Sequence, residues 1–203
     1  MYHPARSHSL VRLALAIVLA TAAATVAFGQ DGVGTSSVTR FADMTEVQGA
    51  GSTLIRTDAA VSIVLTTSGL EPLAPYTIWW VVFNEPAACL GPCDEDDLFN
   101  PDGTMNINEA ADISILYADG ALSDDAGNAA FSAVLLVGAP LGEVVYGPGL
   151  RDAHAAEIHV VVRSHGPLDP ERAFAQLSTF EPHPTIGGDC ALCADQQFAV
   201  HLP

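Results

Sequence analysis

The sequence contains no lysine, and its seven basic residues are all arginines. Two of them, Arg6 and Arg12, precede residue 30, whereas all 24 acidic residues follow it. Residues 30–203 therefore carry five arginines against 24 carboxylates, a net charge of −19 with neutral histidines. Such a surface repels phosphate backbones and anionic lipids, so we expect no nucleic-acid or membrane-surface partner. Cationic partners, divalent metals and saline surroundings remain compatible with it.

Familiar catalytic and nucleotide-binding motifs are also missing. The sequence has no Gly-x-Ser-x-Gly nucleophile elbow, no phosphate-binding loop and no dinucleotide fingerprint. Ser164 and His165 are adjacent, and neighbouring residues of a strand point to opposite faces, which is the wrong geometry for a nucleophile and its base. The sequence therefore favours a non-catalytic protein over an enzyme.

A long apolar run occurs at the N-terminus. Arginines precede residues 13–20, and small residues continue to Ala27-Phe28-Gly29. This order is typical of a secretory signal peptide and predicts cleavage after residue 29. An uncleaved anchor is the alternative, but residues 13–29 are fewer than the ~20 that a spanning helix needs. We expect a secreted protein, extracellular or periplasmic, with no membrane span after cleavage and with residues 30–203 as one domain.

Cysteine is scarce, and the four residues come as two close pairs. Cys89-x-x-x-Cys93 and Cys190-x-x-Cys193 form an even set in a chain that we expect to be exported, which predicts two disulfides. Local bridges would each shape a tight loop, but four cysteines allow three pairings. Both spacings also suit a zinc site of four thiolates, which is the alternative.

The rest of the sequence is a succession of short runs rich in β-branched and aromatic residues, separated by Gly, Pro, Asp and Asn. We expect strands at residues 61–66, 76–83, 113–118, 129–137, 156–164 and 197–202. Short helical turns are expected near Asn106 and Asp169, and an irregular polar lead at residues 30–36. The pattern predicts an all-β, antiparallel β-sandwich of seven or eight strands with one or two helical turns.

Two local resemblances support a sandwich. Residues 70–76 (Leu-Glu-Pro-Leu-Ala-Pro-Tyr) resemble the tyrosine corner of fibronectin type III and related immunoglobulin-like sandwiches, in which the phenol bonds to nearby backbone. Residues 68–79 look like the turn before the copper strand of Cu/Zn superoxide dismutases, yet residues 78–82 contain no histidine. These resemblances imply an immunoglobulin-, fibronectin- or dismutase-like architecture without dismutase activity.

The chain as a whole resembles a group of secreted bacterial β-sandwich proteins. The resembling stretches are residues 79–89 (Trp-Trp-Val-Val-Phe-Asn-Glu-Pro-Ala-Ala-Cys), 97–103, 156–167 (Ala-Glu-Ile-His-Val-Val-Val-Arg-Ser-His-Gly-Pro) and 198–203 (Phe-Ala-Val-His-Leu-Pro). They are spread over most of residues 30–203. That group has no established activity, so the resemblance implies no function.

One expected strand carries polar residues on a single face. With a period of two residues, Glu157, His159, Arg163 and His165 share a face, and the opposite face is apolar. The polar face is a candidate binding surface through Glu157 and Arg163, or part of a transition-metal site with His159, His165 and His201. His159 and His165 are about 20 Å apart in a regular strand, so an ion would need ligands from other strands. A hydrogen-bonded ladder, solvated or covered by a loop, is the alternative.

One loop gathers oxygen-bearing side chains, namely Asp94, Asp96, Asn100 and Asp102. Ca²⁺ takes six to eight oxygen ligands, so this loop is a candidate calcium site, although it lacks the spacing of an EF-hand. A solvated acidic loop is the alternative. We therefore expect an extracellular binding or structural protein stabilised by calcium. The competing hypothesis is a metal-binding protein or metal-dependent enzyme that uses the strand histidines.

Overall fold

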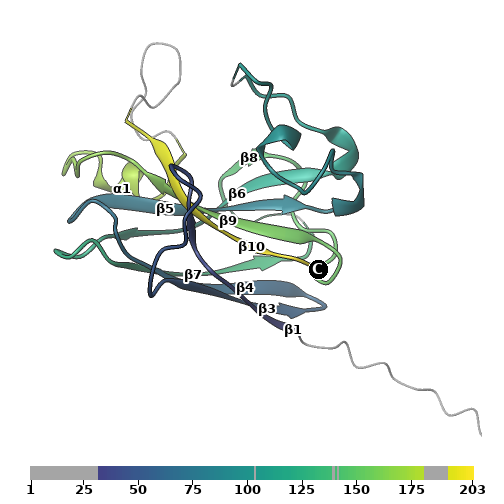
Figure 1. The fold of residues 1–203 in the computed structure, drawn as a ribbon, viewed down its shortest axis with the longest axis horizontal. Helices are drawn as coiled ribbons and strands as arrows, with labels where there is room; N and C mark the ends of the chain where they lie inside the picture. Colours follow the sequence, from purple (N-terminus) through teal and green to yellow (C-terminus); the bar gives the residue numbers. More distant parts are fainter. Residues whose placement is uncertain (1–31, 103, 139, 141, 181–191) are drawn as a thin grey trace, which may run out of the picture.

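The computed structural model describes residues 32–102, 104–138, 140, 142–180 and 192–203. Within these residues, ten strands form two antiparallel sheets that lie one against the other (Figure 1). The strands are β1 (Gly32–Ser36), β2 (Thr39–Arg40), β3 (Gly51–Thr57), β4 (Ala60–Thr67), β5 (Pro75–Phe83), β6 (Ile113–Leu122), β7 (Ala129–Leu136), β8 (Val144–Tyr146), β9 (Glu157–Ser164) and β10 (Ala194–His201). One sheet has the order β1-β3-β4-β7, and the other has the order β2-β10-β9-β5-β6-β8. The predicted all-β, antiparallel sandwich is confirmed, with ten strands in the described residues where seven or eight were expected.

Helical structure in the described residues is limited to short turns. These are η1 (Pro86–Ala88), η2 (Glu95–Asp97), η3 (Glu109–Ala111) and α1 (Ala173–Gln176). Both expected turns begin later than predicted, because Asn108 caps η3 in place of Asn106, and α1 starts at Ala173. No helix in this part of the chain is long and apolar enough to cross a membrane.

The N-terminal edge differs from the prediction. Residues 32–36, expected to be irregular, form β1 and pair with β3 from Gly32↔Arg56 to Ser36↔Ser52. Two of the five residues of β1 are glycines, which are depleted in strands, so the local composition did not predict this edge strand. The predicted signal peptide, residues 1–29, lies outside the described residues.

The main core fills the space between the two sheets. Alternate side chains of β3 and β4, among them Leu54 and Ile63, meet inward-facing side chains of β5 and β9, among them Trp80 and Ile158. Each of these four is at most 1% exposed. Burial of a large apolar side chain contributes about 1.5–3 kcal/mol, so this layer supplies most of the stabilising free energy.

The six-stranded sheet is covered on its outer face too. Trp79, Val81 and Phe83 of β5 point away from the main core into a second apolar cluster, which also contains Cys93 and Leu98. All nine residues of β5 are buried. The strand is apolar on both faces because its two neighbours in the sheet, β6 and β9, satisfy its backbone while apolar layers cover both of its sides.

A tyrosine corner leads into β5. The Tyr76 hydroxyl accepts a hydrogen bond from the backbone N–H of Glu71 at 2.9 Å. This contact confirms the backbone bond that the resemblance implied. Burial raises the pKa of the Tyr76 phenol, so the group stays neutral and can keep this contact at physiological pH.

A buried arginine closes one end of the sandwich. Arg56 of β3 is 8% exposed and points between the sheets. Its guanidinium donates to four backbone carbonyls, at 2.5–3.1 Å, which belong to Ala153, Ala156, His201 and Leu202. Burial lowers the pKa of Arg56 from its ordinary value. This single side chain thereby ties β3 of one sheet to the ends of β9 and β10 in the other.

Candidate functional site

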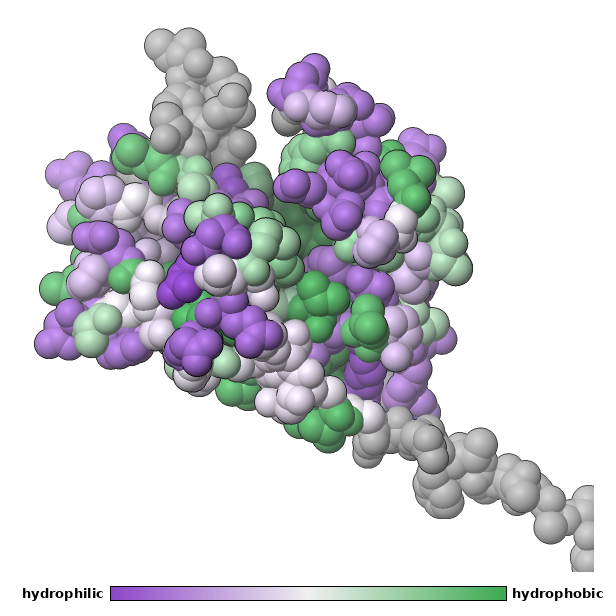
Figure 2. Space-filling model, viewed as in Figure 1, coloured by the Kyte–Doolittle hydropathy of each residue, from purple (hydrophilic) through white to green (hydrophobic). Residues whose placement is uncertain are grey.

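A hollow of about 460 Å³ opens on the outer face of the six-stranded sheet. Its floor consists of outward-facing side chains from four strands, namely Trp79, Val81 and Phe83 of β5, Ile115 of β6, His159 and Val161 of β9, and Phe198 and Val200 of β10. Figure 2 shows the recess, with hydrophobic residues in its depth, between two raised parts of the surface. Its volume is in the range of ~300–1,000 Å³ that small-molecule sites occupy.

Two groups of residues form the walls of the hollow. One wall comes from the 84–112 segment, through Cys93, Asp94, Glu95, Leu98 and Phe99, and the other comprises Phe41, Met44, Phe180 and Asp195. The Phe41 and Phe198 rings lie with their centroids 4.6 Å apart, and Trp79 packs edge-on against Phe180 at 5.0 Å. The lining thus combines six aromatic rings with three carboxylates, and contains no arginine.

A tight turn positions Phe41 and Met44 in the wall. The carboxylate of Asp43 accepts hydrogen bonds from the backbone N–H of Thr45 at 3.1 Å and from its hydroxyl at 2.7 Å. These donors lower the pKa of Asp43. Met44 takes a positive φ of 56°, which completes the turn and leaves its side chain 66% exposed beside the hollow.

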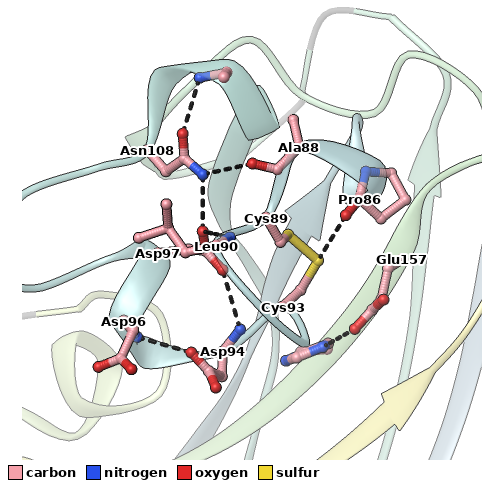
Figure 3. Close-up of a disulfide and its surroundings, with 12 residues drawn as sticks. Pro86, Ala88, Cys89, Leu90, Cys93, Asp94, Asp96, Asp97, Asn108 and Glu157 are labelled. Carbon is pink, nitrogen blue, oxygen red and sulfur yellow. Dashed lines mark hydrogen bonds and ion pairs between the residues drawn. A yellow bond between two sulfur atoms is a disulfide. The ribbon is translucent and has the colours of Figure 1, made fainter.

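A disulfide shapes the 84–112 segment. Cys89 and Cys93 are joined by an S–S bond of 2.03 Å, so the predicted local bridge is present (Figure 3). The bond occupies two of the thiols that the alternative zinc site would need. Cys193 is also disulfide-bonded, and Cys190 lies outside the described residues.

A buried carboxylate anchors the same segment. Asp97 is fully buried, and its Oδ1 accepts hydrogen bonds from the Leu90 N–H at 3.0 Å and from the Asn108 amide at 2.8 Å. Its Oδ2 receives a longer contact, 3.4 Å, from the Asp94 N–H (Figure 3). Asn108 also donates to the carbonyl of Ala88 at 2.9 Å. Asp97 therefore joins the disulfide loop, η2 and the start of η3 into one wall, a role that the sequence analysis missed.

The predicted calcium ligands are not gathered around one point. The Asp94 side chain caps η2 by accepting from the Asp96 N–H at 2.9 Å. Asp102 instead accepts from the N–H and hydroxyl of Thr104, at 3.0 and 2.6 Å, and these donors lower its pKa. Asn100 bonds to Thr104 and Asn106. The oxygens thus serve separate turns, so the geometry of these residues does not support the calcium hypothesis.

The polar side chains on the predicted face of β9 contact other groups of the protein, and His159 also lines the hollow. Glu157 and His159 form an ion pair or hydrogen bond of 2.7 Å between Oε1 and Nε2, and both side chains are nearly buried. The His159 ring also lies 4.9 Å from the Phe83 ring, at the floor of the hollow. Glu157 therefore occupies one nitrogen of the His159 imidazole, and the ring forms part of the floor of the hollow.

Arg163, predicted to bind a ligand, is engaged within the protein. Its guanidinium carbon lies 4.0 Å from the centroid of the Phe180 ring, and one terminal nitrogen contacts Asp195 at 2.7 Å. Its Nε is buried and has no hydrogen-bond partner in the described part of the chain. Neither Arg163 nor Glu157 lines the hollow, although Arg163 contacts Phe180 and Asp195 and Glu157 contacts His159.

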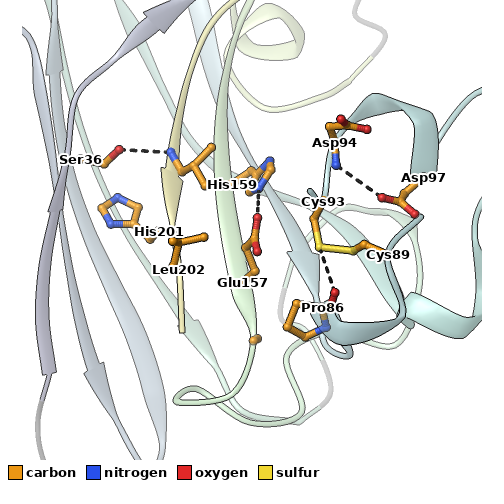
Figure 4. A network of polar contacts seen from close by, with 12 residues as sticks. Ser36, Pro86, Cys89, Cys93, Asp94, Asp97, Glu157, His159, His201 and Leu202 are labelled. Carbon is orange, nitrogen blue, oxygen red and sulfur yellow. Dashed lines mark hydrogen bonds and ion pairs between the residues drawn. A yellow bond between two sulfur atoms is a disulfide. The ribbon is translucent and has the colours of Figure 1, made fainter. Parts of the chain in front are cut away.

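The three candidate metal-binding histidines do not come together. His159 faces the hollow, and His165 is fully buried with its Nε2 2.7 Å from the Thr77 hydroxyl. His201 points the other way, between the sheets, with its Nε2 2.8 Å from the Ser52 hydroxyl. Figure 4 shows His159 and His201 on different sides of β10. In the described ranges, the only group of three or more potential ligands is Cys89, Cys93 and Asp97, in which both cysteines are bonded to each other.

His201 has an unusual environment. Burial lowers its pKa to about 4, and the positive charge of Arg56 and the neighbouring His159 act in the same direction. The imidazole is therefore neutral above that pH and can form a hydrogen bond with the Ser52 hydroxyl. This side chain stabilises the contact between the sheets and does not reach the hollow.

The residues that line the hollow were largely missed from the sequence. One sequence feature did point to the outer face of the sheet. Trp79, Val81 and Phe83 alternate with Trp80 and Val82, and a strand that is apolar on both faces needs an apolar layer on each. The arrangement suits non-covalent capture of a small molecule, since it offers aromatic surface and carboxylates. No family model, no curated protein and no solved structure matches this chain.

Proposed function

We propose that this protein is an exported, non-catalytic binding protein that holds one small molecule with an apolar body in the outer hollow. The observation that carries the proposal is the apolar floor of a 460 Å³ hollow, built around Trp79 and Phe83. A concave apolar surface with a few polar groups at its edge is the usual form of a small-molecule site.

Export is supported by two features of the chain. The N-terminal residues have the order of a signal peptide, and the Cys89–Cys93 bond belongs to a class that persists in oxidising compartments. The net charge of −19 for residues 30–203 favours solubility and disfavours nucleic acid as a partner. Recovery of protein that begins at Gln30 from the periplasm or medium of an expressing bacterium would test this part.

Binding is tested with N-phenyl-1-naphthylamine, an uncharged aromatic probe whose fluorescence rises in apolar surroundings. Titration of the purified chain from residue 30 should give saturable enhancement with one site per molecule. Val161→Trp places a bulky ring on the floor and should weaken the probe affinity at least tenfold, because it fills part of the hollow.

The matched control is Val64→Trp, the same exchange at an outward position on the other sheet. Val64 is 55% exposed and does not line the hollow. This variant should bind the probe as the unmodified protein does, and circular dichroism should show both variants folded. Absence of saturable binding, or equal loss in both variants, would overturn the proposal.

A further inference from the structure

We infer that the hollow selects hydrophobic organic cations, such as alkyl- or arylammonium compounds, over neutral and anionic molecules of the same shape. This inference rests on the proposed function and names the ligand class of that site. It follows from the carboxylates and the aromatic side chains that line the hollow.

The charge of the lining is negative. Asp94, Glu95 and Asp195 contribute carboxylates, and no arginine is among the lining residues. Arg163 pairs with Asp195, whereas neither Asp94 nor Glu95 takes part in an ion pair within the described part of the chain. A cation in the hollow would therefore meet two carboxylates on the wall that are not neutralised by a neighbouring side chain.

The aromatic part of the lining suits a cation as well. Phe41, Phe99, Phe180 and Phe198 are only partly buried and stand around a floor that contains Trp79. The faces of aromatic rings are electron-rich and attract ammonium or guanidinium groups that lie within about 6 Å of the ring centroid. An uncharged ligand would gain the apolar contact but not this attraction.

The protein already uses this chemistry at the edge of the hollow. The Arg163 guanidinium lies 4.0 Å from the Phe180 centroid and 2.7 Å from a carboxylate oxygen of Asp195. The guanidinium of Arg163, which is itself an organic cation, is thus held between the face of the Phe180 ring and the carboxylate of Asp195. Asp94 and Glu95, with Phe99 next to them on the opposite wall, offer the same pair of groups without an internal cation.

The test uses three probes of nearly equal size: benzyltrimethylammonium, its uncharged carbon isostere neopentylbenzene, and the anion benzylsulfonate. Each displaces N-phenyl-1-naphthylamine from the chain that begins at residue 30, at one fixed ionic strength. We expect the cation to bind about tenfold more tightly than the isostere, a difference that corresponds to about 1.4 kcal/mol. The sulfonate should bind more weakly than either.

A double variant identifies the groups responsible. Asp94→Asn with Glu95→Gln removes both charges, and asparagine keeps a side-chain oxygen that can accept the hydrogen bond capping η2. The preference for the cation should fall below threefold, because the affinity for the cation should drop more than the affinity for neopentylbenzene. Asp125→Asn with Glu171→Gln makes the same change of net charge at exposed positions away from the lining and should keep the preference.

The possible outcomes separate this inference from the proposed function. Equal binding of cation and isostere, tighter binding of the sulfonate, or a preference that survives the double variant would overturn the inference while the hollow remained a binding site. If none of the probes displaced N-phenyl-1-naphthylamine, because that probe itself did not bind, both proposals would fail. A tenfold preference that is lost only in the Asp94/Glu95 variant supports the inference.

Discussion

Removal of the Asp97 carboxylate should open one wall of the hollow without unfolding the sandwich. Asp97→Ala leaves the Leu90 N–H and one N–H of the Asn108 amide without an acceptor, since both donate to Oδ1 at 3.0 and 2.8 Å. The other N–H of Asn108 keeps its bond to the Ala88 carbonyl. The third contact, from the Asp94 N–H at 3.4 Å, is long and contributes little. The main core between the sheets contains none of these groups.

The magnitude follows from the two strong contacts. Leaving a buried donor without a partner costs about 1–3 kcal/mol, so the loss of two acceptors should destabilise the closed wall by about 3 kcal/mol. Since 1.4 kcal/mol is a tenfold change in an equilibrium constant, the open form should become about 100-fold more populated. Asp97→Asn keeps one oxygen and should cost roughly half as much.

Amide hydrogen exchange measures this opening directly. The amides of Leu90 and Asp94 should exchange about 100-fold faster in Asp97→Ala, whereas amides of the central strand β5 should change little. Asp96→Asn is the matched control, because Asp96 is an exposed neighbour whose side chain forms no hydrogen bond or ion pair with the described residues of the wall. Unchanged exchange at Leu90, or an equal increase throughout β5, would refute the assignment of Asp97 as a local anchor.

Three further predictions concern the rest of the molecule. Arg56→Met should lower the free energy of unfolding, measured in urea, by about 3 kcal/mol, because four carbonyls lose their donor. The exposed control Arg151→Met should lower it by less than about 1 kcal/mol. Equal effects of the two variants would contradict the role of Arg56. Because the pKa of His201 is about 4 in the folded protein and 6.5 ordinarily, the unfolded chain binds the additional proton, so this group should destabilise the fold as pH falls through 6.5 towards 4. Allowing for solvent screening, wild type should lose about 1–2 kcal/mol more than His201→Gln between pH 7 and pH 4, and identical pH profiles would disprove this. Calcium at millimolar concentration should move the melting temperature by less than about 1 °C relative to EDTA, since the oxygens of Asp94 and Asp102 serve separate turns; a rise of several degrees would restore the calcium hypothesis.

The sequence predicted the fold class well because its central strands have a strong pattern. Residues 76–83 and 156–164 are rich in β-branched or aromatic residues, and both coincide closely with β5 and β9. Four strands were not predicted. Of the edge strands, β1 is rich in glycine, and β2 and β8 have only two and three residues. The interior strand β3 was missed because Ser52 and Arg56 occupy its buried face, so its apolar alternation is interrupted. Edge strands bury less apolar surface, so local pattern says less about them.

The site was harder to predict because it depends on contacts between distant parts of the chain. The hollow brings Phe41, Trp79, Phe99 and Phe198 together, and only the sheet order and the path of the 84–112 segment make them neighbours. The two-residue period placed His159 and Arg163 correctly on one face of β9. Their partners within the protein, such as Asp195 and Phe180, come from other segments and could not be read from that period.

The two tryptophans allow the most direct test of the outer hollow as the ligand site. Trp79 lies in its floor and Trp80 points into the main core, although they are adjacent in β5. In a ¹⁵N-correlated NMR titration with N-phenyl-1-naphthylamine, the indole N–H signal of Trp79 should shift progressively to saturation, while that of Trp80 should stay nearly fixed. A shift confined to Trp80, or no shift in either signal at saturating probe, would contradict the account.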